Sequence, residues 1–194
     1  DIQLQQAFPI ESNIFDFLNK YDLDLQKNLV LDSKCGNVQV QQSVGLFRMN
    51  RAVQYPFFPV VDTFNSKDSV AGIIVNKLEQ ILPLFPSEIK IDTVRSENVL
   101  NVSTLFTSSN NSGLMSSNFM LSPDPQQNPF LKLLGQSGKV LSALSSLKGG
   151  GELMLISDSK FLSDDGGMSI PDNMVFLMNA VDYLADDEDL ISLR

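Results

Sequence analysis

The sequence contains no histidine and one cysteine, Cys35. Without histidine, Ser-His and Cys-His catalysis and His-ligated zinc or iron are excluded within these 194 residues. A lone cysteine cannot close an internal disulfide, so the fold must depend on its hydrophobic core. Because no convincing pair of nucleophile and base can be assembled, we predict a protein that is not an enzyme and that holds no metal or cofactor.

Basic residues are also scarce: 14 Lys and Arg face 23 Asp and Glu, for a net charge of −9. This balance argues against nucleic acid as a partner and against docking on an anionic membrane through a basic face. No apolar run approaches the ~20 residues of a membrane-spanning helix. The sequence also lacks an initiator methionine. We therefore expect a single domain over residues 1–194, a soluble segment excised from a longer protein with any anchor removed.

Short apolar segments predict a chain that alternates between helices and strands. A helix with apolar positions at Ile14, Phe17, Leu18 and Tyr21 precedes a buried strand at 28–32. Val38 and Val40 alternate with polar residues, as in an exposed or edge strand. Further strands are expected at 98–107 and 152–157, the last one preceded by a glycine hinge at 149–151. This order is typical of an α/β fold.

The last predicted helix begins near Pro171, a residue that suits the first helical turn, with Ser169 as its cap. Its apolar residues recur at helical spacing, and we expect them to face the core: Met174, Leu177, Met178, Val181 and Leu184.

The loop between the last strand and this helix is the candidate ligand-binding loop. It carries Asp158, Ser159, Asp164 and Asp165, and ligands of open α/β sheets bind at the carboxyl ends of strands. The three aspartates could hold a hard cation, but their spacing is not that of an EF-hand. The favoured alternative is that Asp158 fixes the loop by accepting backbone N–H groups, while the Asp pair is solvated.

The segment 54–61 is rich in aromatic residues and is interrupted by two prolines, which suits an extended edge segment. Tyr55, Phe57 and Phe58 are the candidate partner surface, because aromatic residues are enriched where interfaces carry energy. Burial of these rings against the sheet is the alternative. Cys35 has only Lys34 nearby to activate it, so we expect an inert thiol.

Several passages, in order along most of the chain, resemble the auxiliary proteins of ABC transporters typified by the gliding-motility protein GldG. The resemblance rests on these passages: Phe15-Asp-Phe-Leu-Asn-Lys-Tyr21 with Asn28-Leu-Val-Leu-Asp32; Tyr55-Pro-Phe-Phe-Pro59; Leu105-Phe-Thr-Ser108; Asp158-Ser-Lys-Phe-Leu-Ser163; Asn179-Ala-Val-Asp-Tyr-Leu184; and Asp187-Glu-Asp-Leu-Ile-Ser-Leu-Arg194. One departure is Lys160, which stands where the family commonly has an acidic residue and weakens a ligand role for the loop.

The resemblance implies an α/β domain similar to class I glutamine amidotransferases and flavodoxins, with a mostly parallel sheet, helices on both faces and no catalytic Cys-His pair. The family's earlier strand–helix units are missing ahead of Asp1, so we expect only the later part of the full domain.

The resemblance also implies a non-enzymatic accessory component of a bacterial ABC transport system, linked to gliding motility. It would contact an ABC permease and ATPase on the periplasmic face of the inner membrane, anchored by segments outside these residues. The alternative function is a module that binds a carbohydrate or another small ligand through the loops at the strand ends.

Overall fold

The computed structural model describes residues 6–44, 47–92, 94–124, 132–164 and 166–193. Its sheets are small, and every pairing between its strands is antiparallel. Along the described chain the elements are α1 (Ile14–Asn19), β1 (Asp24–Leu25), β2 (Leu29–Asp32), β3 (Cys35–Val44), β4 (Phe47–Pro59), α2 (Ser69–Ile74), β5 (Ile89–Lys90), β6 (Val99–Thr107), β7 (Ser112–Met115), β8 (Val140–Leu147), β9 (Glu152–Ile156), α3 (Pro171–Leu184) and α4 (Glu188–Leu193).

These strands form four small sheets within the described residues. Three of them are pairs, β1–β5, β2–β7 and β3–β4, and the fourth has the order β6–β8–β9. The predicted strand at 28–32 is confirmed by β2, and the one at 98–107 is confirmed by β6. The boundaries of these two strands were therefore predictable from local sequence patterns.

The predicted mostly parallel sheet is wrong, and the lengths of the connections give the reason. Parallel neighbours need a crossover of a dozen or more residues, whereas only residues 148–151 separate β8 from β9. Gly150 and Gly151 adopt φ values of 87° and 92°, which a tight turn uses and which other residues rarely adopt. The predicted glycine hinge is thus the turn of a β-hairpin, and α3 follows the last strand instead of linking two parallel ones.

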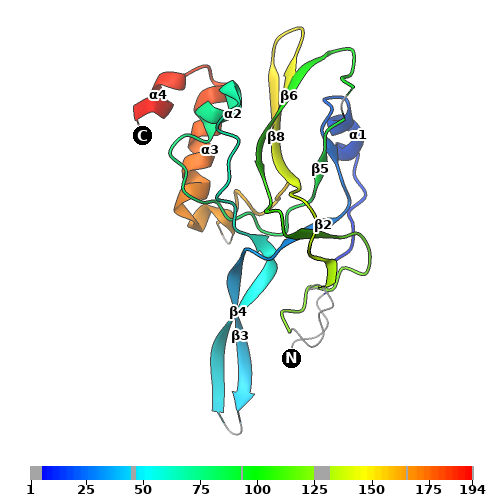
Figure 1. Cartoon of the computed structure of the whole chain (residues 1–194), viewed down its shortest axis with the longest axis vertical. Coiled ribbons are helices and arrows are strands. Elements are labelled where there is room, and N and C mark those ends of the chain that lie inside the picture. Colours follow the sequence, from blue (N-terminus) through cyan, green and yellow to red (C-terminus); the bar gives the residue numbers. More distant parts are fainter. Residues whose placement is uncertain (1–5, 45–46, 93, 125–131, 165, 194) are drawn as a thin grey trace.

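The three-stranded sheet lies between two layers of other elements (Figure 1). On one side Leu105, Phe106 and Leu144 pack with Phe176 of α3 in the largest core cluster. On the other side Val99, Val102 and Ala143 pack with Leu18 of α1 in a second cluster, which also contains residues near β1 and β5. The core therefore sits on both faces of this sheet.

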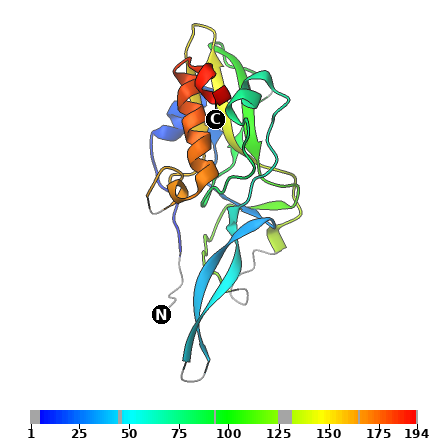
Figure 2. The same ribbon diagram turned by 90° about the vertical axis from the view of Figure 1, so that its left-hand side faces the viewer.

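The β3–β4 hairpin extends away from these layers along the longest axis of the molecule (Figures 1 and 2). At its base, Tyr55 and Phe57 join a third core cluster with Leu31 and Met115 of the β2–β7 pair. The base is thus anchored in the body, while the distal part of the hairpin stands clear of it.

The predicted C-terminal helix is confirmed as α3, but the predicted inward stripe is wrong. The buried residues of α3 are Asn173, Phe176, Asn179 and Ala180. Met178, Val181 and Leu184 from the predicted stripe are 43%, 55% and 47% exposed. Ser169 is not the cap either, because Ile170 occupies the N-cap position and no side chain caps the helix.

Buried amides explain the rotation of α3. The side chain of Asn173 accepts the N–H of Leu82 at 2.9 Å and donates to the carbonyl of the same residue at 3.1 Å. Asn179 donates to the carbonyl of Ile74, the last residue of α2, at 3.0 Å. Such carbonyls at a helix end have no intrahelical partner, so inward asparagines satisfy groups that an apolar side chain would leave unpaired.

Candidate functional site

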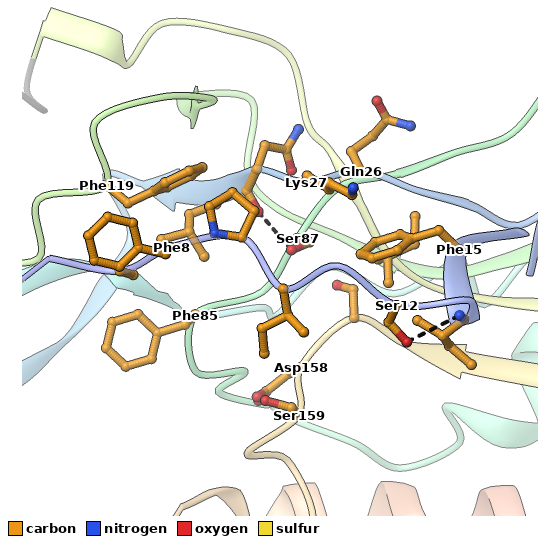
Figure 3. Close-up of a pocket in the computed structure, with 18 of the residues that line it drawn as sticks. Phe8, Ser12, Phe15, Gln26, Lys27, Phe85, Ser87, Phe119, Asp158 and Ser159 are labelled. Atoms are coloured by element: carbon orange, nitrogen blue, oxygen red, sulfur yellow. Dashed lines mark hydrogen bonds between the residues drawn. The ribbon is translucent and has the colours of Figure 1, made fainter.

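A groove of about 460 Å³ runs beneath the N-terminal segment 7–15, between it and the ends of β2 and β9 (Figure 3). Its walls are mainly apolar, and the larger side chains that form them are Phe8, Ile10, Phe15, Phe85, Phe119 and Ile156. Polar atoms enter it from Asn28, Ser87 and the stretch 157–159. An apolar cavity of this size with a few polar groups is the usual form of a small-molecule site.

Asp158 lies along one side of the groove and fixes the loop that follows β9 (Figure 3). Its carboxylate accepts the backbone N–H of Leu84 and that of Lys160, each at 2.7 Å. Burial raises the pKa of this carboxyl to about 6, although backbone N–H groups act in the opposite direction. Asp158 therefore ties the loop to a segment far away in the sequence.

Ser157, just before Asp158, belongs to the groove wall, but its hydroxyl is buried from solvent and has no hydrogen-bond partner among the described residues. Its backbone is fully engaged: its N–H donates to Leu141 at 3.0 Å, and its carbonyl accepts from Ser87 at 3.0 Å. The sequence had not singled out Ser157, since no local pattern marks a serine at a strand end.

Comparison with known proteins then supplies the family. The family described as "ABC-type uncharacterized transport system" matches residues 2–180. The chain belongs to this family. No curated protein and no solved structure matches it.

Membership makes the chain an auxiliary component of an ABC transport system, which is a membrane-associated assembly. Among the described residues, no helix is long and apolar enough to cross a bilayer. The match identifies this family and does not distinguish GldG from its other members.

In this ABC transport auxiliary, the structure separates the residues of the predicted ligand loop. Asp158 and Ser159 line the groove, whereas Asp164 is exposed and absent from its wall. Asp165 lies outside the described residues. Among the residues that are described, no three His, Cys, Asp or Glu side chains gather as metal ligands would.

The predicted partner surface at Tyr55, Phe57 and Phe58 lies in an aromatic cluster with Phe85. Tyr55 and Phe57 are buried, at 4% and 0% exposure, and Phe58 is half-buried. Phe58 packs edge-on against Tyr55 and Phe85, with ring centroids 4.9 and 5.1 Å apart. The Tyr55 hydroxyl donates to the carbonyl of Leu121 at 2.5 Å, and burial raises its pKa. Phe58 is the part of this set that a partner could reach.

Cys35 is half-buried at the start of β3, and burial raises the pKa of its thiol. The nearby negative charge of Asp32 also raises the pKa of the Cys35 thiol. The Asp32 carboxylate itself accepts hydrogen bonds from the N–H and the hydroxyl of Ser109, each at 2.6 Å. A thiol with a raised pKa is a poor nucleophile at neutral pH, because the thiolate is the reactive form.

Helix α3 carries an exposed apolar stripe. We call Met178, Val181 and Leu184 the α3 stripe; their spacing puts them on one side of the helix, and all three are exposed. The exposed acids Asp186 and Asp187 follow directly after it. The stripe is therefore an apolar surface with an acidic margin.

Proposed function

We propose that this chain is a non-enzymatic, extracytoplasmic accessory component of a bacterial ABC transport system that works through contact with the permease. The family match supports the transport system, and the α3 stripe is the observation that supports protein contact. A helix that shows apolar residues at positions i, i+3 and i+6 is suited to a hydrophobic groove on another subunit. Its acidic margin suits a groove with basic residues at the rim.

A role without catalysis agrees with the chemistry of the described residues. The sequence has no histidine, and the pKa of Cys35 is raised, so its thiol is protonated at neutral pH. We infer that the chain works on the periplasmic face of the inner membrane. Other parts of the system would supply the membrane anchor and the contact with the ATPase. Gliding motility is the process that the resemblance to GldG suggests.

The test is affinity purification of the tagged full-length protein from detergent-solubilised native membranes, followed by mass spectrometry. We expect stoichiometric recovery of a permease and its ATPase. The double variant Val181→Ser/Leu184→Ser should reduce this recovery at least about tenfold, because each buried aliphatic side chain contributes roughly 1.5–3 kcal/mol to a contact. Leu100→Ser is the matched control, since Leu100 is 63% exposed on β6, away from α3.

Two results would count against the proposal in different ways. Recovery of no transporter subunit, even after cross-linking, would remove the accessory role. Recovery that the double variant leaves unchanged would keep the accessory role but move the contact away from the α3 stripe.

A second candidate function is binding of a carbohydrate or another small polar ligand in the groove. The observation that favours it is the groove itself, whose aromatic side chains Phe8, Phe15 and Phe119 offer faces on which a sugar ring could stack. Thermal-shift titration with a panel of mono- and disaccharides tests this function. Phe8→Ala, which removes an exposed ring from the groove wall, should abolish any shift. Ser163→Ala, outside the groove wall, should leave it intact.

A further inference from the structure

The distal part of the β3–β4 hairpin is a free-standing ribbon, which we call the arm and define as residues 37–42 and 47–54. Its pairing is regular, with Val38 opposite Val53 and Gln42 opposite Met49. Both views show it projecting from the body without any other described element beside it (Figures 1 and 2). A two-stranded hairpin is marginally stable alone in water, so a long one that stands free is expected to meet a second surface.

The two faces of the arm differ sharply in polarity. Side chains alternate between faces along a strand, and directly paired residues share a face. One face, which we call the apolar face, carries Val38, Val40, Phe47, Met49 and Val53, interrupted by Gln42 and Arg51. The opposite face carries mostly carboxamides, together with Ala52 and Arg48: Asn37, Gln39, Gln41, Asn50 and Gln54. Phe47 and Met49 are 75% and 59% exposed, so the far end of the apolar face is open to water.

The charge of the hairpin is opposite to that of the chain. Residues 33–61 contain Lys34, Arg48 and Arg51 and no Asp or Glu, whereas the whole chain has a net charge of −9. Lys34, at the base, pairs with Asp62. Two arginines therefore remain as the cations of the arm, both close to Phe47 and Met49 in the sequence.

We propose that the apolar face of the arm docks on an anionic lipid bilayer. Phe47 and Met49 would enter the boundary between headgroups and acyl chains, as the apolar side of an interfacial amphipathic segment does. Arg51 on the apolar face, and Arg48 beside Phe47 at the distal end of the opposite face, would bind lipid phosphates. Long arginine side chains can reach headgroups while their stems lie on apolar surface. The carboxamide face stays in water, where its amides are hydrated.

Two observations favour a bilayer over a protein as the occupant. The arm has cations but no acidic side chain, which complements a uniformly anionic surface. The family, moreover, is that of a membrane-associated transport system. The negative body would be repelled by the same lipids, so the arm would meet the membrane with its distal end first. This contact is separate from the α3 stripe and does not depend on the permease contact.

Co-sedimentation of the 194-residue chain with large unilamellar vesicles tests the inference. We expect binding to vesicles of equal parts phosphatidylcholine and phosphatidylglycerol, and much weaker binding to phosphatidylcholine alone. Arg48→Gln/Arg51→Gln should weaken the binding roughly 30-fold, since each cation near an anionic surface contributes about fivefold. Phe47→Ser/Met49→Ser should weaken it at least about tenfold. A parallel run without vesicles corrects for self-association.

Matched controls keep the result specific to the apolar face. Asn50→Ser lies on the opposite face of the arm, and Val181→Ser lies on α3, so both should bind as the wild type does. Absence of binding by the wild type overturns the proposal, as does binding that the arm variants leave unchanged. If the arm variants instead lose the permease in the purification above while the wild type ignores vesicles, the occupant of the arm is a protein and the lipid proposal is wrong.

Discussion

Replacing Asn173 by alanine tests the orientation of α3 directly. The side chain is 1% exposed and makes two hydrogen bonds to the backbone of Leu82, at 2.9 and 3.1 Å. Removing it leaves an N–H and a carbonyl without protein partners, at about 1–3 kcal/mol each for fully buried groups. Leu82 is only half-buried, so water recovers part of this loss. Alanine also gains about 0.5 kcal/mol in helix propensity. We expect a net loss of about 2 kcal/mol in the free energy of unfolding.

Urea denaturation followed by far-UV circular dichroism measures this change, with an unaltered m value as the check on two-state unfolding. Val181→Ala is the matched control, because Val181 is 55% exposed on the same helix and should change stability by no more than about 0.5 kcal/mol. If α3 instead presented its apolar stripe to the core, the order would reverse. A loss below about 1 kcal/mol for Asn173→Ala, or a larger loss for Val181→Ala, would refute the orientation described here.

Three further predictions concern buried groups. Burial raises the pKa of Asp158 to about 6 from an ordinary value of 3.8, so the folded state holds this proton more tightly than the unfolded chain does. The wild type should therefore lose stability relative to Asp158→Asn as the pH rises from about 4 to about 6 and change no further above that range, measured by urea midpoints across pH. Tyr55→Phe leaves the carbonyl of Leu121 unpaired and should cost about 1–2 kcal/mol in chemical denaturation, whereas an unchanged midpoint would argue against that hydrogen bond. Phe176→Ala removes a ring that packs 5.3 Å from that of Phe106 and should cost about 3–5 kcal/mol or prevent folding, which thermal melts would report.

Sequence patterns located most of the regular elements but could not supply their directions in space. The apolar runs at 28–32 and 98–107 are strands, and the helix at Pro171 begins where proline and spacing predicted. Strand direction was inferred from the family resemblance and from the strand-then-helix order at the end of the chain. The short glycine connection at 149–151 instead indicated antiparallel strands, because only a hairpin can join two neighbouring strands through so few residues.

The error in α3 shows why polarity alone misplaces a helix. Asn173 and Asn179 count as polar in any periodicity analysis, and so the apolar stripe was expected to face inward. Their partners, Leu82 and Ile74, lie 91 and 105 residues away in the sequence, and no local pattern reveals such a contact. Buried backbone groups that need partners decided the orientation, and the apolar stripe was left outside.

The candidate site was predictable only in part, for a similar reason. Asp158 was singled out, and its role as an acceptor of backbone N–H groups was weighed, but the partner at Leu84 lies 74 residues away. The N-terminal wall of the groove, with Phe8 and Ile10, has no periodicity of its own. Its side chains become a surface only when segment 7–15 crosses the ends of β2 and β9.

The net charge of the whole chain does not describe the charge of each surface. A net charge of −9 argued against any basic face, yet no acidic residue occurs between Asp32 and Asp62. The hairpin gathers this stretch into one projecting element, whereas Asp186 and Asp187 lie beside the α3 stripe. The arm and the α3 stripe therefore have margins of opposite sign, and the proposals above assign them different partners. Added salt should weaken both contacts, but reversing the charge of the arm should affect the lipid contact alone, because the two surfaces share no residue.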